Sequence, residues 1–169
     1  MTDDQSSTSS DRWERRAAAA GLVIPDALPA HPFFPSVCLA GNVAYTSGIV
    51  AVEGPPWKMV YAGSVGDEID VETAQRSAAQ AMLNTLGNLR AALGGSLDRV
   101  ERFAKFTGFV RCRPDFGDMP MVVNGASEVL KAVFGEDLLP ARSAIGVAAL
   151  PGKASVEIEA VVLLHPPHQ

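Results

Sequence analysis

The stretch of the chain that decides the fold runs from Ala141 to Leu164 and reads ARSAIGVAALPGKASVEIEAVVLL. Two apolar runs, Ala141–Leu150 and Ser155–Leu164, flank a Pro-Gly pair, which marks a break between two strands. In the second run, apolar side chains alternate with Glu157 and Glu159. This alternation is typical of a strand with one face in a core and the other exposed. The end of the chain is therefore predicted to be sheet.

Working back toward the N-terminus, the pattern predicts two helices and more strands. Apolar residues at helical spacing predict helices that begin after Asp70 and Asp118, which we expect to act as N-caps, and that end at glycines. The predicted helices are Val71–Leu93 and Met119–Phe134; the predicted strands upstream of Ala141 are Val37–Ala40, Val43–Thr46, Ile49–Val52, Lys58–Tyr61 and Val100–Cys112. This order predicts an α+β fold with both helices on one face of a mixed sheet.

Three segments are predicted along the chain. Residues 1–10 are polar and are expected to be a disordered tail. Residues 11–36 are expected to form a short helix, Arg12–Ala20, and a proline-rich connector. Residues 37–166 are expected to form the main domain.

The composition of the chain argues against several classes of function. The chain has 169 residues and a formal net charge of 14 − 19 = −5, which argues against a nucleic-acid binder with a broad basic face. It has three histidines and two cysteines, too few for a zinc centre of the usual spacing or a histidine-based triad. We expect no metal and no organic cofactor. With no signal or spanning pattern, the expected compartment is the cytoplasm, and Cys38 and Cys112 are expected to be small buried side chains. Because arginines flank Cys112, a reactive thiol there is the weaker alternative.

Five residues stand out as candidates for chemistry. Arg142 begins an otherwise apolar strand, so it either lies on an exposed edge, pairs with Glu157 or Glu159, or binds a carboxylate ligand. The two glutamates form either a solvated face or a pair whose repulsion raises one pKa. Asn124, in an apolar helix, is either a satisfied amide or part of a site. Gly48 marks either a bulge or a close approach.

Several segments in the same order resemble the RidA/YjgF family, also called the L-PSP endoribonuclease family. The most specific match is the pair formed by Pro140-Ala141-Arg142-Ser143 and Val156-Glu157-Ile158-Glu159-Ala160. The resemblance covers about residues 34–164 and is closest to a divergent branch of the family. Its other matching segments are Gly41-Asn42 through Thr46-Ser47-Gly48, the helix from Thr73 to Leu93, the strand Phe103–Val110, and Asn124.

The resemblance implies a chorismate-mutase-like fold and a homotrimer whose sheets form a central barrel, with clefts between the subunits for small carboxylates. It implies a hydrolase, an enamine/imine deaminase that releases the 2-oxo compound and ammonia. In that reading Arg142 binds the carboxylate and Glu157 positions or activates water, so these two are the expected catalytic residues. The expected substrate-binding residues are Gly48, Asn124, Phe34, and the backbone near Ser143 and Ala144.

Three positions depart from the family pattern. Phe34 stands where the family has a pocket tyrosine, Ala144 where it has a cysteine, and Gly146 where it has a glutamate. These changes leave two alternatives open: a non-catalytic trimer that binds small carboxylates, and an endoribonuclease. The second would rely on the local basic residues Arg99, Arg102, Lys105, Arg111 and Arg113. A membrane partner is not expected.

Overall fold

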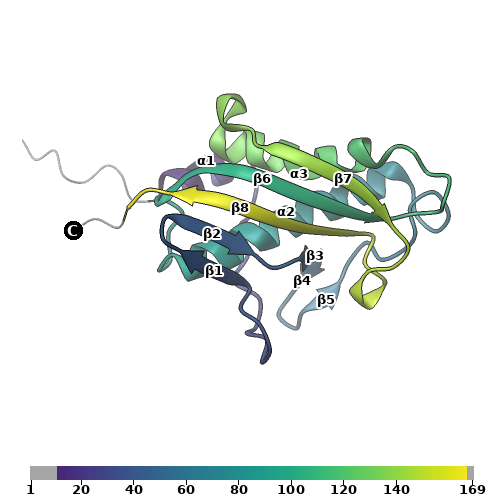
Figure 1. Ribbon diagram of the computed structural model, residues 1–169, viewed down its shortest axis with the longest axis horizontal. Helices are drawn as coiled ribbons and strands as arrows, with labels where there is room; N and C mark the ends of the chain where they lie inside the picture. Colours follow the sequence, from purple (N-terminus) through teal and green to yellow (C-terminus); the bar gives the residue numbers. More distant parts are fainter. Residues whose placement is uncertain (1–10, 167–169) are drawn as a thin grey trace, which may run out of the picture.

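The computed structural model describes residues 11–166 (Figure 1), so the prediction made for residues 1–10 lies outside the described residues. The helices are α1 (Arg12–Ala19), α2 (Val71–Ala92) and α3 (Met119–Phe134), with short 3₁₀ turns at Glu136–Leu138 and Pro151–Lys153. The strands are β1 (Val37–Ala40), β2 (Val43–Thr46), β3 (Ile49–Val50), β4 (Val52–Glu53), β5 (Lys58–Met59), β6 (Val100–Arg111), β7 (Ala141–Val147) and β8 (Val156–Leu164).

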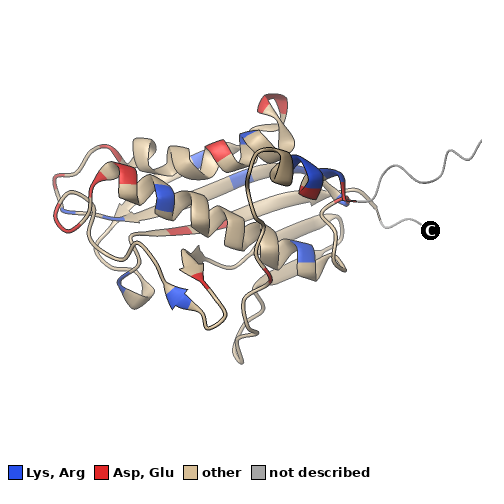
Figure 2. Cartoon of the chain, turned by 180° about the vertical axis from the view of Figure 1, so that it is seen from behind, with Lys and Arg blue, Asp and Glu red and all other residues tan. Residues whose placement is uncertain are grey.

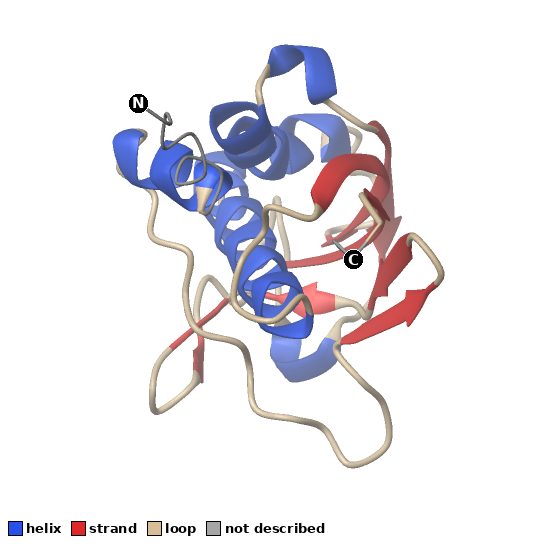
Figure 3. Ribbon diagram, turned by 90° about the vertical axis from the view of Figure 1, so that its left-hand side faces the viewer, coloured by secondary structure: helices blue, strands red, loops and turns tan. Residues whose placement is uncertain are grey.

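The strands form a mixed sheet in the order β1-β2-β8-β6-β7, and β3 also pairs with β8. Only the β6–β7 pair is parallel among these described strands, while β4 and β5 form a separate small ribbon. α2 and α3 cover one face of the sheet (Figures 1 and 3). The predicted α+β fold is therefore confirmed. Among residues 11–166, no helix has the length and apolar character needed to cross a lipid bilayer.

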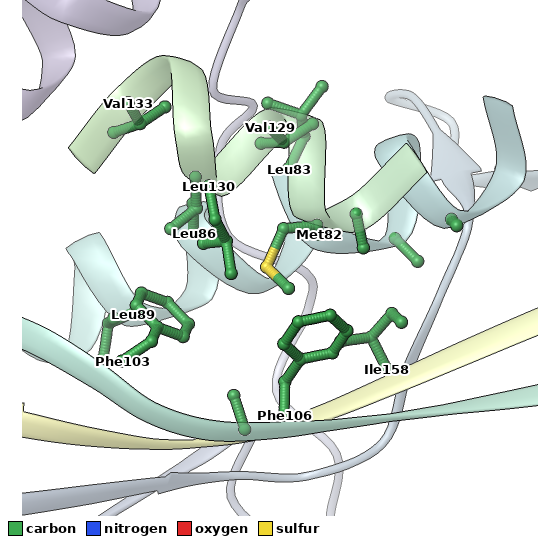
Figure 4. Packing of buried hydrophobic residues seen from close by; sticks show 14 of the residues in the cluster. Met82, Leu83, Leu86, Leu89, Phe103, Phe106, Val129, Leu130, Val133 and Ile158 are labelled. Atoms are coloured by element: carbon green, nitrogen blue, oxygen red, sulfur yellow. The ribbon is translucent and has the colours of Figure 1, made fainter. Parts of the chain in front are cut away.

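The core lies between the two long helices and the sheet (Figure 4). Met82 and Leu86 of α2 and Leu130 of α3 are buried against Phe106 of β6 and Ile158 of β8. In β8 the even-numbered residues from 156 to 164 are all buried, as the alternation predicted. The odd-numbered residues therefore lie on the open face of the sheet.

Glycine allows α3 to approach both of its neighbours closely. A Cβ atom at Gly125 would overlap the carbonyl of Gln75 in α2, and one at Gly108 would lie 2.6 Å from Val123 of α3. Real Cβ atoms are almost never this close to another atom, so both positions require glycine. These contacts fix α3 over the β6–β7 side of the sheet.

The N-terminal segment is part of the packed structure. Trp13 of α1 is buried, its ring lies 4.8 Å from that of Phe134, and its indole nitrogen donates to Val100 O at 3.3 Å. The carboxylate of Asp98 accepts from the backbone nitrogens of Asp11 and Arg12 at the start of α1. α1 is thus attached both to α3 and to the loop before β6.

Three local predictions were wrong. Cys38 is exposed, because it lies on the edge strand β1, which the helices barely cover. Asp118 makes no side-chain cap, since its backbone is not extended (ψ 29°), whereas Asp70 is extended (ψ 170°) and accepts from Thr73 N at 2.7 Å. β7 ends at Val147 rather than residue 150, because the chain turns away toward Pro151–Lys153.

Candidate functional site

Arg142 lies on β7, the edge strand beside β6, and its side chain reaches across to α3. Nη1 donates to Ser127 Oγ at 2.7 Å, and Nη2 donates to Asn124 Oδ1 at 2.7 Å and to Pro120 O at 3.3 Å. A guanidinium has five N–H groups, so these bonds leave Nε–H and one N–H of Nη1 without a partner in the described chain. No carboxylate of residues 11–166 pairs with Arg142, and the side chain is exposed. Of the alternatives that the sequence left open for Arg142, a pair with Glu157 or Glu159 is therefore not made within the described chain.

The three acceptors come from one stripe of α3. Positions 120, 124 and 127 follow the i, i+4, i+7 spacing that places side chains on one helix face. Asn124 was a candidate from the sequence, and its Oδ1 orients the guanidinium. Ser127 and the carbonyl of Pro120 were missed, although the helical spacing from Asn124 would have indicated Ser127.

Glu157 lies on the open face of the sheet. It sits on β8 between Val50 of β3 and Phe109 of β6, and its side chain is half-buried. Burial raises the pKa of this carboxyl group, and the charge of Glu159, two residues along the strand, raises it further. Within the described chain, no hydrogen bond or ion pair is made by its carboxylate. Glu157 is therefore a carboxyl group well suited to exchange protons.

Gly48 explains how the Glu157 side chain is held in place. A Cβ atom at Gly48 would overlap Glu157 Oε1 and lie 2.7 Å from Cδ. The carboxyl group thus rests on the bare Cα of Gly48, just before β3. Of the two interpretations left open by the sequence, a close approach is the one that the structure shows.

Arg142 and Glu157 point away from each other in one chain. The register places Arg142 beside Phe106 and Phe106 beside Ala160, and both of these neighbours are buried beneath the helices. Glu157 lies three residues before Ala160 on β8, so its side chain points to the opposite face. One chain therefore cannot bring both groups to one small molecule.

The remaining candidates divide between the same two faces. Ser143 faces the open side beside Thr107, while Ala144 packs against the helical core. Because β7 is an edge strand, the backbone groups on its outer side are open to a ligand. Phe34 lies at the end of the connector, and it is 49% exposed.

The basic residues of β6 do not gather at this site. Arg111 pairs with Glu68 and Arg113 with Asp115, so two of the five arginines and lysines considered for nucleic acid already have carboxylate partners. Figure 2 shows basic residues on α1 and otherwise a mixture of both signs over the helical side. Burial raises the pKa of the Cys112 thiol, which disfavours a reactive thiolate.

Comparison with known proteins identifies the family. The model of the family described as Endoribonuclease L-PSP matches residues 24–164. The chain belongs to this family. It is 37% identical over 147 residues to Protein TCP17 of Trypanosoma cruzi, covering 86% of this chain and 89% of that protein. It is 32% identical over 124 residues to a 2-iminobutanoate/2-iminopropanoate deaminase of Dermatophagoides farinae, covering 73% and 80%.

A solved structure supports the fold. The protein Atu1372 of Agrobacterium tumefaciens, of unknown function, superimposes with a TM-score of 0.82 at 37% identity, covering 90% of this chain and 94% of that one. The match to the L-PSP family confirms the resemblance inferred from the Arg142 and Glu157 strands. It begins within the connector, at residue 24.

One departure from the L-PSP pattern has a visible structural reason. A Cβ atom at Gly146, where the resemblance places a glutamate, would lie 3.1 Å from Cys112 Sγ and 3.7 Å from Met119. These two side chains occupy the space that a longer residue would need. In this member of the L-PSP family, the position of that glutamate is therefore filled by the side chains of Cys112 and Met119.

Proposed function

We propose that this protein hydrolyses a reactive enamine or imine of a small carboxylic acid to the 2-oxo compound and ammonia, using Arg142, Glu157 and water. The observation that carries the proposal is Arg142, an exposed arginine oriented by α3 and without a carboxylate partner in the described chain. A planar guanidinium matches a carboxylate, so the free acid group of a small substrate is the natural occupant. The deaminase relative supports the reaction class.

The chemistry requires one proton-transfer group. As the water oxygen bonds to the C=N carbon, the ionised Glu157 takes a proton from the water and returns it to the nitrogen as the C=N π bond breaks, which gives a carbinolamine. Glu157 then takes the carbinolamine O–H proton and delivers it to the same nitrogen. When the C–N bond of the resulting carbinolamine breaks, the carbonyl forms and ammonia leaves with the transferred protons. Burial raises the pKa of Glu157 toward neutral pH. A carboxyl group with such a pKa can both accept and return a proton.

The active assembly is proposed to be a homotrimer with sites between its subunits. Because Arg142 and Glu157 lie on opposite faces of the sheet, a site that uses both must take one from each of two copies. A cyclic trimer would present each such interface three times. This reasoning, together with the family resemblance, supports the proposed oligomer.

The first test concerns the carboxylate anchor. Replacing Arg142→Lys keeps the charge but removes the planar fork, and we expect pyruvate binding and imine turnover to fall about 10- to 100-fold. Arg76→Lys is the matched control, because Arg76 also bonds a hydroxyl, that of Thr73, on an exposed helix face. Calorimetry gives the binding and the decay of the imine's ultraviolet absorbance gives the turnover. An unchanged Arg142→Lys protein would refute the anchor.

The second test concerns the shared site. Arg142→Ala and Glu157→Gln chains should each be inactive alone, yet a co-expressed mixture should recover about a quarter of wild-type activity if subunits combine at random in intersubunit sites. A mixture that stays inactive while forming mixed trimers would show that the two residues do not share a site. Trimer mass is measured in every sample.

The alternative is a non-catalytic trimer that binds small carboxylates. The replacement of the family's cysteine and glutamate by Ala144 and Gly146 favours it, because it leaves fewer polar groups near the anchor. Saturable 2-oxo acid binding that depends on Arg142, without faster imine decay, would select this alternative.

A further inference from the structure

Three aromatic side chains of the connector form an exposed cluster. The rings of His31 and Phe34 are stacked, with centroids 4.1 Å apart and planes 23° apart, and Phe33 lies 5.8 Å from His31. Phe33 is 89% exposed and Phe34 is 49% exposed. Adjacent exposed aromatic residues in a folded protein indicate a binding surface.

The connector holds this cluster in a fixed place. Arg90 of α2 donates to Pro25 O at 3.1 Å, and the buried Asn88 accepts from Leu28 N at 2.8 Å. A Cβ atom at Gly87 would lie 2.5 Å from Pro25 O, so the connector lies directly on α2. Figure 3 shows it leaving α1, passing α2 and turning outward before β1. The aromatic cluster is therefore presented by an anchored segment.

An apolar hollow lies beneath the cluster. It has a volume of about 600 Å³, is open to solvent and is lined by the connector and the last turns of α2. Its apolar walls include Leu28, Phe34, Val37, Ala91 and Ala92. Pockets for small molecules have volumes of this order and are lined mainly by such side chains. The hollow can take an aromatic ring or a branched aliphatic chain.

Hydrogen bonds connect this hollow to the candidate site. Ser47 Oγ donates to Pro35 O at 2.7 Å, and Ser47 N donates to Ser36 O at 2.9 Å. The next residue is Gly48, on which the carboxyl group of Glu157 rests. Phe34 is therefore next to Pro35, which is hydrogen-bonded to Ser47. Ser47 in turn is next to Gly48, which contacts Glu157.

We propose that the stacked His31 and Phe34 rings and the adjoining hollow bind the substrate side chain, so that the preferred substrates are 2-imino acids with aromatic or branched aliphatic side chains. The inference rests on the proposed function, and it names the substrate class of that same site. The imidazole of His31 extends the face of Phe34, so a flat side chain gains a second ring to pack against. A methyl side chain, as in the imine of alanine, has too little apolar surface to pack against both rings or to fill the hollow.

The test compares imines prepared with an amino-acid oxidase from phenylalanine, leucine and alanine. For the wild type we expect kcat/KM to be about tenfold or more higher with the phenylalanine imine than with the alanine imine. His31→Ala should reduce this preference about 2- to 10-fold, mainly through KM, whereas His31→Phe keeps the stack and should retain it. Val23→Ala is the matched control, since Val23 is an exposed apolar residue of the same segment, 80% exposed, and does not line the hollow.

Each other outcome has a defined meaning. Wild-type turnover with equal kcat/KM for the alanine and phenylalanine imines would overturn this inference and leave the proposed function standing. No turnover, but phenylpyruvate binding tighter than pyruvate binding and weakened by His31→Ala, would retain the pocket and reject the hydrolysis. Loss of the trimer in His31→Ala, measured by mass, would show that the cluster is a contact between copies and would overturn the inference.

Discussion

Replacing Gly48→Ala tests how the Glu157 carboxyl group is held. The new Cβ would overlap Glu157 Oε1, so either the carboxyl group or the backbone before β3 must move. Overpacking of this kind costs about 1–3 kcal/mol. For a chain of this length that corresponds to a fall in Tm of about 2–12 °C, taking about 2–4 °C for each kcal/mol. Thermal unfolding followed by circular dichroism, at one protein concentration, measures it.

The same substitution in a Glu157→Ala background gives the decisive comparison. With the carboxyl group absent, the clash disappears, and Gly48→Ala should be neutral or stabilising by about 0.4–1 kcal/mol, because it restricts the unfolded chain. Gly117→Ala is the control, since no atom lies within 4 Å of a Cβ there. If Gly48→Ala costs the same free energy in both backgrounds, the carboxyl group does not rest on Gly48 and its proposed placement is wrong.

Three further predictions concern stability. Because the folded-state pKa of Glu157 is raised above its usual 4.5, its ionised carboxyl group destabilises the fold at pH 7, and this penalty should disappear as pH falls through the raised pKa; denaturant titrations should show Glu157→Gln as the more stable protein at pH 7, with the difference closing toward pH 4.5. Trp13→Ala should cost about 3–5 kcal/mol, seen as a lower urea midpoint, since a buried ring is removed; a small loss would mean that α1 is not part of the core. Asp70→Ala should cost about 1 kcal/mol by the same titration and Asp118→Ala much less, because only Asp70 caps its helix.

The sequence was sufficient for the elements whose pattern is local. The alternation around Glu157 and Glu159 predicted the buried and open faces of β8. The helical stripe of α2 predicted only part of its burial, because Ala81–Leu89 is buried on every side, Asn84 and Asn88 included. Arg142 was identified because a guanidinium at the start of an apolar strand needs an explanation. These inferences needed only the period of each element.

What the sequence could not provide depends on register and on distant neighbours. That Arg142 and Glu157 point to opposite faces follows only when β7 is paired with β6 and β6 with β8. Arg142 donates to three groups of α3, among them Ser127, 15 residues upstream, and no local rule states that this face of α3 meets the edge strand. Cys38 was expected to be buried because its strand is apolar, yet β1 lies at the edge of the sheet.

The hydrogen bonds from Arg142 to α3 also lower the entropy cost of binding a ligand. A free arginine side chain samples many rotamers, and fixing one costs up to about 2 kcal/mol. In this chain Ser127, Asn124 and the carbonyl of Pro120 have already selected the rotamer, so that loss is incurred when the protein folds. A small anion with few atoms to contribute would therefore meet an arginine that is immobilised before it arrives, and would retain more of its contact energy as affinity.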